Sequence, residues 1–460
     1  MEKPSLPSGT RDFSPAVMQG RKYILSVMET IFVSHGFGAM ETPALENLQT
    51  LQGKYGDEGD QLLFKVLNSG DFLSKVNEKT FQEKDSKKLA TQIADRGLRY
   101  DLTVPLARFV VMNRDKITFP FKRYQIQPVW RADRPQRGRY REFWQCDIDV
   151  VGTQSVVSES ELIEMVQEVF FRLDLGVNIR INHRGILDSF LPILGSVDNW
   201  NSFMIVIDKA DKIGKEGVIR ELEARGLGMA VSAWNWLWDS KSIAGNDAKI
   251  ALAESASMIQ GSALQKALTD TKQILNLLGS TANVVLDFTL ARGLSYYTGM
   301  VFEIELNDSR LPEDFRLGSL GGGGRYDNLT EIFGLRDVSG VGVSFGLDRV
   351  FDSLDAGTLF PVFTFNQHAV LVCAMNDSCL PFAVNTARAL RAAGLHCELY
   401  PGTPKLKKQL DYANSNSLGY AAIIGNEERE AQKVSFKNLH TGTQQLLSIA
   451  EIIQALTLTK

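Results

Sequence analysis

Two strand-forming runs joined by an arginine-rich segment constrain the fold of this chain more than any other feature. Residues 117–127 and 142–151 are rich in β-branched and aromatic side chains, a composition typical of strands. Residues 122–141, which begin inside the first run, carry seven basic residues and a single acid, Asp133. We therefore expect an antiparallel hairpin with a long, arginine-rich loop.

The basic segment is a local feature, because the whole chain of 460 residues has a formal net charge of −4. Such a segment is either a solvated surface or a binding site for an anion. Aromatic side chains alternate with the arginines, which a purely solvated surface does not need; they are Tyr124, Trp130, Tyr140, Phe143 and Trp144. The pattern favours an anionic ligand, and the solvated surface remains the alternative.

Composition places the chain among globular proteins, with 44% hydrophobic and 23% charged residues. It excludes a disordered, collagenous or disulfide-scaffold protein. No apolar run approaches the roughly 20 residues that span a bilayer, and residues 1–15 lack the apolar segment of a secretory signal. The four cysteines are too scattered for a disulfide framework or a zinc ribbon. These features predict a cytoplasmic protein with no membrane contact and no metal cage built from protein side chains.

Periodicity divides the chain into a mixed α/β part, interrupted by a helical segment, and a smaller C-terminal α/β part. Ser14 and Pro15 are suited to begin a helix that ends near residue 34. A further helix is expected near 326–333. The predicted boundaries are 1–186 and 283–355 for the two parts of the main domain, 187–282 for a helical insertion, 356–367 for a linker and 368–460 for the C-terminal α/β domain.

Four consecutive glycines at 321–324 imply a close approach of the backbone to a ligand or to another strand. The segment lacks the lysine and the Ser or Thr of a P-loop, and its spacing differs from the dinucleotide fingerprint. Ordinary mononucleotide- and dinucleotide-binding folds are therefore disfavoured. A plain tight turn remains an alternative to a ligand contact.

Polar residues gather along the two predicted hairpin strands. Arg131 follows the first strand, and Gln145, Asp147 and Asp149 alternate along the second, so these three share one of its faces. A guanidinium opposite such acceptors suits a ligand that has both phosphate and ammonium groups.

The segment 124–149, which contains RPQRGRYREFWQ, resembles motif 2 of class II aminoacyl-tRNA synthetases in the form found in histidyl-tRNA synthetases. Residues 290–299 (LARGLSYYTG) are similar to the histidine-specific signature L-x-R-G-L-D-Y-Y of that family. Further similarities cover the family's N-terminus, motif 1, its LRxDLTxPxAR element, its glycine-rich segment and motif 3, at 9–12, 36–43, 98–108, 321–327 and 341–349. The resemblance extends over nearly the whole chain in the expected order.

The chain departs from the family pattern at two positions. Ser295 stands where the signature usually has Asp, and Asp133 is shorter than the Glu common in bacterial members. The aspartates at positions 101 and 149 resemble the eukaryotic and archaeal members of the family at these positions. The compact RPQRGR loop, in contrast, resembles the loop of bacterial members.

The resemblance implies an α/β (α+β) fold in which a class II synthetase antiparallel sheet is flanked by helices, with a helical insertion domain and a C-terminal α/β anticodon-binding domain. It implies that the chain activates L-histidine with ATP, accompanied by Mg2+, and transfers it to the 3′ end of tRNA(His). Because the family uses the motif 1 helix at a subunit interface, the resemblance also implies a homodimer.

The resemblance assigns three arginines to catalysis. Arg131 would hold the α-phosphate and the substrate carboxylate, Arg292 the other side of the α-phosphate, and Arg349 the β- and γ-phosphates. The implied ATP-binding set, in which Phe143 stacks on adenine, comprises Arg131, Asp133, Arg139, Phe143 and Arg349. At the tip of the motif 2 loop, Arg134 and Gln136 would contact the acceptor end of tRNA.

The implied histidine-binding set comprises Asp101, Thr103, Arg131, Gln145, Asp149, Arg292, Tyr296, Tyr297 and Tyr326. Asp101, Thr103 and Gln145 would hold the α-ammonium group, for which acceptor oxygens are suitable. Asp149 and Tyr297 would each meet one ring nitrogen of the imidazole. A tyrosine packed in the core remains an equal alternative for Tyr326.

The same resemblance leaves other functions open. The regulatory subunit of ATP phosphoribosyltransferase has the synthetase fold without its activity, and a synthetase-like module would bind RNA or sense a ligand. The α/β part after residue 366 and the three arginines favour the enzyme, whereas Ser295 mildly favours the module. A synthetase for another amino acid would share motifs 2 and 3 but not the segment ARGLSYYTG.

None of the five histidines falls in one of these motifs, so a histidine acting as general base is not expected. We expect loop or surface positions for all of them, namely His35, His183, His368, His396 and His440.

Overall fold

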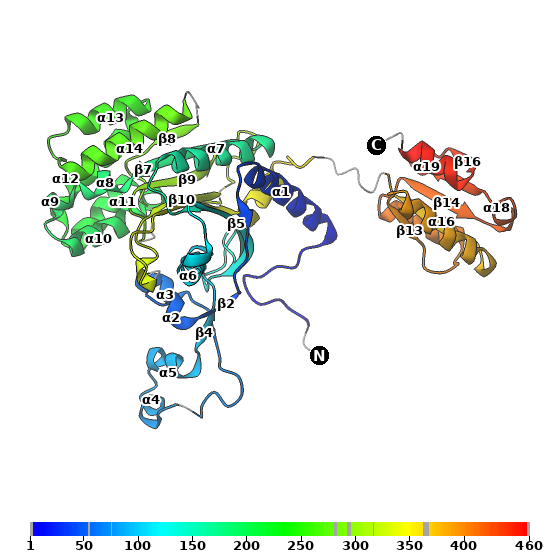
Figure 1. The fold of residues 1–460 in the computed structure, drawn as a ribbon, viewed down its shortest axis with the longest axis horizontal. Coiled ribbons are helices and arrows are strands. Elements are labelled where there is room, and N and C mark those ends of the chain that lie inside the picture. The colour runs from blue at the N-terminus through cyan, green and yellow to red at the C-terminus, as the bar shows by residue number, and fades with distance from the viewer. Residues whose placement is uncertain are drawn as a thin grey trace. The chain divides into compact units, whose positions relative to one another are not determined.

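The computed structural model describes residues 3–53, 56–74, 76–279, 283–291, 296–315, 317–361 and 368–457. The chain forms two compact units, Met1–Phe360 and Pro361–Lys460, and each is described by itself (Figure 1). Among the described residues, no helix combines the length and the apolar character needed to cross a bilayer.

A mostly antiparallel sheet forms the centre of the first unit, which confirms the predicted fold class. Its eight strands have the order β1-β5-β6-β11-β10-β9-β7-β8, and only the pairs β1–β5 and β7–β8 are parallel. The strands are β1 (Gly38–Ala39), β5 (Phe121–Trp130), β6 (Glu142–Val151), β7 (Val177–His183), β8 (Val284–Leu286), β9 (Met300–Leu306), β10 (Gly321–Tyr326) and β11 (Gly340–Gly346).

The predicted arginine-loop hairpin is confirmed as β5 and β6. The two strands pair from Phe121 opposite Val151 to Trp130 opposite Glu142. The first strand begins at Phe121 rather than at residue 117. Pro120 directly precedes it and has no amide hydrogen to donate to a neighbouring strand.

The glycine run is a strand, and the prediction of a helix over 326–333 is wrong. Gly321–Tyr326 forms β10 between β9 and β11, and only the 3-10 turn Glu331–Phe333 follows it. A Cβ atom at Gly323 would lie 1.8 Å from the carbonyl oxygen of Gly342. Glycine is therefore required, because the backbones of β10 and β11 approach too closely there for a side chain.

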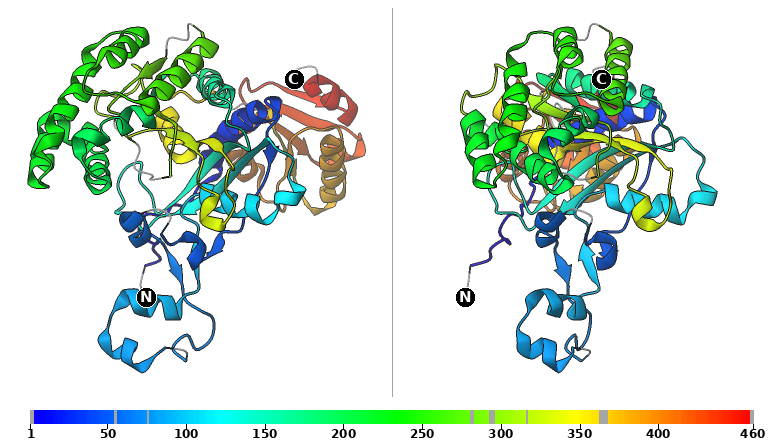
Figure 2. Two further views of the ribbon diagram at one scale, coloured as in Figure 1. Left: turned by 60° about the vertical axis from the view of Figure 1, so that its left-hand side comes forward. Right: turned by 90° about the vertical axis from the view of Figure 1, so that its left-hand side faces the viewer.

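Four helices form a layer on one face of the sheet (Figure 2). Three of them contact its strands, and the first packs on two of the others. The four helices are α1 (Pro15–Ser34), α7 (Val157–Arg172), α14 (Ser262–Leu278) and α15 (Leu347–Ala356). Helix α1 begins as predicted, since Pro15 opens it and the Ser14 hydroxyl accepts a hydrogen bond from the Val17 amide. Alternate residues of β6, among them Cys146 and Ile148, are buried in this apolar core.

The polar face of β6 lies on the other side of the sheet, toward α6 (Thr103–Met112). The chain between β1 and α6 forms a second, small sheet of order β2-β4-β3. Two short helices, α4 and α5, project from this sheet at the bottom of Figure 1. These elements are β2 (Leu45–Asn47), α2 (Leu48–Leu51), α3 (Gly56–Gln61), β3 (Lys65–Val66), α4 (Glu78–Glu83), α5 (Ser86–Ile93) and β4 (Arg96–Leu98).

A run of helices fills the chain between β7 and β8, at the upper left of Figure 1. It comprises α8 (Arg184–Asp188), α9 (Leu191–Leu194), α10 (Val197–Ile207), α11 (Ala210–Ala224), α12 (Val231–Asp239), α13 (Asn246–Ser255) and α14. Buried Arg180 of β7 ties the run to the sheet, because it pairs with Asp211 of α11 at 2.7 Å and with Asp287 at 2.7 Å. The helices belong to the first compact unit, and the domain boundaries predicted at 187 and 282 stay predictions.

His183 is buried, which contradicts the expectation of a surface or loop position. It ends β7, and its Nδ1 accepts a hydrogen bond from the Gly185 amide at 3.0 Å, so it caps α8. Its Nε2 lies 3.6 Å from the Asp270 carboxylate of α14. A strand that turns directly into a helix places this residue inside, which the histidine alone does not indicate.

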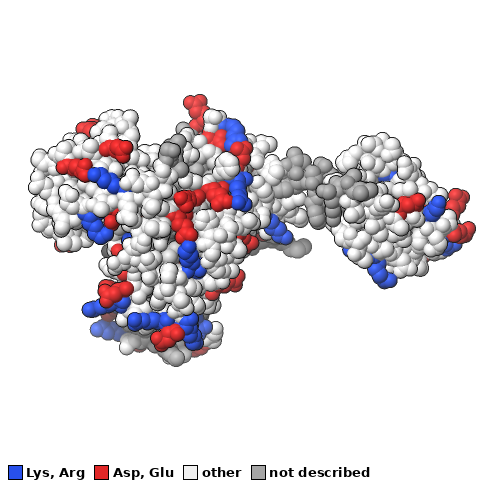
Figure 3. All heavy atoms as spheres, turned by 45° about the horizontal axis from the view of Figure 1, so that its top comes forward, with Lys and Arg blue, Asp and Glu red and all other residues white. Residues whose placement is uncertain are grey.

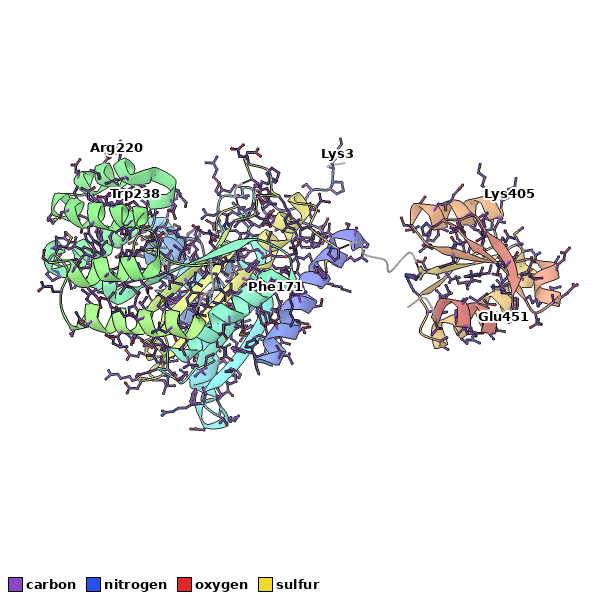
Figure 4. The ribbon with its side chains drawn as sticks, turned by 90° about the horizontal axis from the view of Figure 1, so that it is seen from above. Lys3, Phe171, Arg220, Trp238, Lys405 and Glu451 are labelled. Atoms are coloured by element: carbon purple, nitrogen blue, oxygen red, sulfur yellow. The ribbon has the colours of Figure 1, made fainter. Side chains whose placement is uncertain are left out.

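The second unit is a sheet of order β13-β12-β14-β15-β16 between helices. Alternate residues of β12 face two separate cores, one with α16 and α19 and one with α17. Figure 4 shows Lys405, which precedes α17, and Glu451 of α19 on opposite sides of the sheet. The elements are β12 (Val370–Ala374), α16 (Leu380–Ala392), β13 (Cys397–Leu399), α17 (Leu406–Ser415), β14 (Tyr420–Ile424), α18 (Asn426–Glu430), β15 (Val434–Asn438), β16 (Gln444–Leu447) and α19 (Ile449–Thr457).

The buried carboxylate of Asp348 joins three parts of the first unit. Its Oδ1 accepts hydrogen bonds from Arg11 of the N-terminal segment at 2.5 Å and from Arg21 of α1 at 2.6 Å. Its Oδ2 accepts one from the backbone amide of Trp144 in β6 at 2.8 Å. Because Arg21 is also buried, each charge compensates the other.

We expect Asp348→Ala to lower the free energy of unfolding by about 3–5 kcal/mol, because it leaves the Arg21 guanidinium buried without its counter-charge. All six tryptophans lie before residue 361, so tryptophan fluorescence during urea unfolding reports on the first unit. Lys88→Ala is the control, since its ion pair with Glu83 is on the surface and its loss is expected to change nothing measurable. Equal midpoints for the two variants would contradict this role of Asp348.

Candidate active site

One cavity on the polar face of the sheet gathers most of the residues predicted from the sequence. Its floor is formed by β6, β10 and β11, and its wall by the arginine loop, the start of α6 and the segment before β9. The predicted residues that line it are Asp101, Thr103, Arg131, Asp133, Arg139, Phe143, Gln145, Asp149, Tyr296, Tyr297, Tyr326 and Arg349.

Three predicted residues are not placed in the cavity. Arg134 and Gln136 do not line it, and Gln136 instead pairs through its backbone with Arg139 in the turn of the arginine loop, N to O at 3.1 Å. Arg292 and the neighbouring Ser295 lie outside the described residues.

Asp149 is held at the bottom of the cavity by two buried partners. Arg123 Nη2 lies 2.7 Å from its Oδ2, and the Tyr326 hydroxyl donates to its Oδ1 at 2.5 Å. Burial and the Asp149 charge raise the pKa of Tyr326 well above its ordinary value, so this phenol remains a donor. A Cβ atom at Gly342 would lie 2.0 Å from Asp149 Oδ1, so only glycine leaves room for the carboxylate.

Arg123, which pairs with Asp149, was not singled out from the sequence. Its side chain has no exposed surface, and Nε and Nη1 have no hydrogen-bond partner among the described residues. The available signal was the alternation of Arg123, Gln125 and Gln127 along β5, which places three polar groups on one face of a strand. In the sequence, however, Arg123 looked like one more member of the basic segment.

Asp147 and Gln145 lie beside Asp149 on β6. The Gln145 amide donates from Nε2 to the Ser344 hydroxyl at 2.7 Å. Burial raises the pKa of Asp147 to about 7, and the Asp149 charge adds to that rise, whereas Arg123 and a hydrogen bond from Ser344 oppose it. The alternation along the second strand predicted that Asp147 shares this face but indicated no role for it, and no sequence pattern pointed to Ser344.

The other part of the cavity is formed by guanidinium groups. The Arg131 guanidinium carbon lies 4.3 Å from the centroid of the Tyr100 ring and 5.1 Å from that of the Phe143 ring, and its Nε donates to the Tyr100 carbonyl. Arg349 donates from Nε to the Gly138 carbonyl at 2.8 Å and from Nη1 to the Ser319 carbonyl at 2.5 Å. Arg131 and Arg349 are therefore held in place by backbone oxygens, and their charges are not neutralised by these contacts.

The cavity thus combines carboxylates (Asp101, Asp147 and Asp149) with guanidinium groups (Arg131, Arg139 and Arg349). A ligand that is cationic at one end and anionic at the other matches this distribution. No group of three or more His, Cys, Asp or Glu side chains is arranged to hold a metal in the described part of the chain.

Comparison with known proteins identifies the family. A sequence profile described as histidyl-tRNA synthetase matches residues 71–350, and one described as an anticodon binding domain matches residues 367–458. The chain belongs to the histidyl-tRNA synthetase family. It is 46% identical to a histidine–tRNA ligase of Cytophaga hutchinsonii, over 99% of this chain and 100% of that protein.

Two further relatives agree with this assignment. A histidine–tRNA ligase of Bacteroides fragilis is 45% identical and matches over 99% of each chain. The crystal structure of histidyl-tRNA synthetase from Nostoc sp. PCC 7120 matches with a TM-score of 0.79 and 28% identity, over 100% of both chains. These matches confirm the predicted resemblance over the full length, whereas the roles of single residues stay predictions.

The raised pKa of Asp147 predicts how stability depends on pH. An unfolded aspartate loses its proton near its ordinary pKa of 3.8, whereas folded Asp147 keeps it up to about pH 7. The folded state binds more protons in this interval, so the free energy of unfolding falls as the pH rises through it. Asp147→Asn cannot ionise, so we expect its melting temperature to rise relative to the wild type from about pH 5 to about pH 7.

Asp308→Asn is the control, because hydrogen bonds from Arg310 hold the pKa of Asp308 well below its usual range. That carboxylate is ionised in both states across the same interval, so its effect on the melting temperature is expected to be constant. A constant effect for Asp147→Asn as well would contradict the raised pKa.

Proposed function

We propose that the chain catalyses ATP-dependent activation of L-histidine to histidyl-adenylate and transfers the histidyl group to the 3′ end of tRNA(His). Membership of the family supports the reaction. The observation that carries the proposal in this chain is the cavity itself, where buried carboxylates meet guanidinium groups.

The carboxylate-lined part of the cavity is proposed to bind histidine through its imidazole ring and its α-ammonium group. Asp149 and Tyr297 meet the two imidazole nitrogens, and Tyr326 orients the Asp149 carboxylate through its hydroxyl. Asp101, Thr103 and Gln145 accept from the α-ammonium group. A site that relies on buried polar partners can reject an analogue lacking one of the hydrogen bonds by about 10⁴-fold.

The arginines are proposed to stabilise charge during activation. An oxygen of the histidine carboxylate attacks the α-phosphorus of ATP, the bond to the bridging oxygen breaks, and pyrophosphate leaves. Arg131 and Arg292 bind the α-phosphate from two sides, and Arg349 binds the phosphates that leave. Guanidinium groups suit this task, because their charge is permanent and their donors are planar.

Transfer to tRNA needs no protein base in this proposal. The terminal ribose hydroxyl attacks the carbonyl carbon of the adenylate, AMP leaves, and the departing phosphate accepts the hydroxyl proton. This agrees with the absence of histidine from the cavity lining in the described residues.

Mg2+ is proposed to enter with ATP and to neutralise charge on its phosphates. Asp133 lines the cavity and offers a carboxylate with only a distant partner, Arg139 at 3.7 Å. Asp348 is less suitable, because two arginines already bind its Oδ1. One protein oxygen together with phosphates and waters matches the coordination that Mg2+ prefers.

Contacts with tRNA are proposed at the arginine loop, where Arg134 and Gln136 stand at the tip, and in the C-terminal unit that matches the anticodon-binding profile. Exposed Lys405, Lys407 and Lys408 of that unit are candidate phosphate contacts. Acidic and basic side chains are intermixed on the face shown in Figure 3, so no broad basic surface supports tRNA binding on that face. A homodimer and cytoplasmic location remain predictions of the family resemblance and the composition.

Exchange of labelled pyrophosphate into ATP, without tRNA, tests the proposed activation. We expect exchange that depends on histidine and is absent with every other standard amino acid. Binding of histidine without any exchange would instead favour the regulatory-subunit or sensor alternatives.

The two half-reactions separate the roles of the arginines from those of the loop tip. Arg292→Ala should slow adenylate formation by at least about 100-fold, the scale of one lost charge-stabilising donor, with histidine binding still measurable. Gln136→Ala should leave adenylate formation unchanged and slow only the transfer to tRNA. Pre-steady-state measurement of both steps checks this, and equal losses in both steps for Gln136→Ala would refute its placement at the acceptor end.

A further inference from the structure

We propose that Ser344 and Asp147 are positioning residues that fix the Gln145 carboxamide with its oxygen, not its nitrogen, toward the α-ammonium group of histidine. The inference rests on the proposed function, because it explains how one of the proposed histidine ligands acquires its direction. Neither residue needs to touch the substrate for this role.

The orientation of Gln145 decides whether it attracts or repels a cation. Its Nε2 donates to Ser344 Oγ at 2.7 Å, while its Oε1 is buried and has no hydrogen-bond partner among the described residues. The side chain lines the cavity and the residue is only 9% exposed. An ammonium group can donate only to the oxygen of a carboxamide, so a flipped amide would present two N–H groups to a positive charge.

Ser344 alone cannot fix this orientation. A hydroxyl both donates and accepts, so it can bond either end of the Gln145 amide equally well. If the Ser344 proton pointed to Gln145, the amide oxygen would accept it and the amide nitrogen would turn to the cavity. A second group must therefore take the hydroxyl proton.

Asp147 is placed to take that proton. Ser344 of β11 lies directly opposite Asp147 of β6 in the strand register, so its hydroxyl and this carboxylate are neighbours on one face of the sheet. Once a bound ammonium group favours the ionised form of Asp147, this carboxylate only accepts, so the Ser344 hydroxyl donates to it and offers a lone pair to the Gln145 amide. The nitrogen of the amide is thereby drawn to Ser344, and its oxygen remains on the cavity side.

The other polar side chains near Asp147 are already paired with other groups, so Ser344 is the hydroxyl available to it. On β5, Gln125 lies opposite Asp147, but its amide nitrogen donates to Thr42 at 2.8 Å and to Gln127 at 2.6 Å. Arg123, also on β5, pairs with Asp149. Asp147 Oδ1 has no hydrogen-bond partner in the described part of the chain, although the residue is only 2% exposed.

Ionised Asp147 is therefore costly without a ligand, in agreement with the burial that raises its pKa to about 7. A bound α-ammonium group adds positive charge to the cavity and favours the ionised carboxylate. The acceptor state of Asp147 is thus reinforced when the substrate is present.

The test compares ligands with and without the ammonium group in Ser344→Ala, Asp147→Asn, the double variant and Ser344→Thr. The probes are histidine, histidinol, which keeps the ammonium group, and 3-(imidazol-4-yl)propionate, which lacks it. Inhibition constants come from pyrophosphate exchange, and direct binding is measured by calorimetry. Thermal unfolding verifies that each variant is folded.

We expect Ser344→Ala to weaken histidine and histidinol by about 10- to 100-fold, with the KM for ATP and the inhibition by imidazolylpropionate unchanged. Ser344→Thr keeps the hydroxyl and should restore binding. Asp147→Asn should weaken the same two ligands, and its effect should vanish once Ser344 is alanine, since both residues act through one hydrogen bond.

Two outcomes would overturn the inference. Equal weakening of imidazolylpropionate by Ser344→Ala would show a general loss of site structure. A full effect of Asp147→Asn in the Ser344→Ala background would show that Asp147 binds the ammonium group directly. Failure of the proposed function is seen separately, as absence of histidine-dependent exchange in the wild-type protein.

Discussion

A guanidinium with no exposed surface, that of Arg123, is the interaction on which the cavity floor depends. It lies against Asp149 at 2.7 Å and lowers the pKa of both Asp149 and Asp147, while burial raises it. Without this charge, two carboxylates on neighbouring positions of one strand face would share a buried site, and the pKa values of both would rise further. A neutral pair would lose its attraction for an ammonium group. The buried arginine therefore permits a negatively charged pocket inside a sheet, although burying it is costly by itself.

Glycine is the second condition for the same floor. Strands β10 and β11 approach so closely that a Cβ at Gly323 would reach the carbonyl of Gly342, and a Cβ at Gly342 would occupy the place of Asp149 Oδ1. Gly323 therefore permits the close pairing of the two strands, and Gly342 leaves space for the Asp149 carboxylate. The Oδ1 of this carboxylate accepts a hydrogen bond from the Tyr326 hydroxyl.

Elements whose structure depends on residues adjacent in the sequence could be predicted from the sequence. The hairpin β5–β6 and the capped start of α1 followed from adjacent residues, whereas the cavity-lining residues followed from the resemblance to the family motifs. The glycine strand was missed because glycine has little intrinsic preference for strands, and the reason for it lies on another strand. Arg123, Ser344 and Asp348 were missed for a related cause: each acts through a partner that the fold brings from a distant part of the chain. His183 shows the same limit, since only the packing of α14 makes its position an interior one.

Buried charged and polar side chains in this molecule differ in how completely their hydrogen-bonding atoms are paired. Arg325 and Glu159 form a two-pronged pair at 2.6 and 2.7 Å, and Asp348 binds two arginines and a backbone amide, so these sites are complete as they stand. Arg123, Gln125, Gln145 and Asp147 each keep at least one buried polar atom without a hydrogen-bond partner among the described residues. Such atoms cost free energy wherever they occur. Gln145 and Asp147 line the cavity, where a ligand with a cationic group can complete their unpaired oxygens Oε1 and Oδ1.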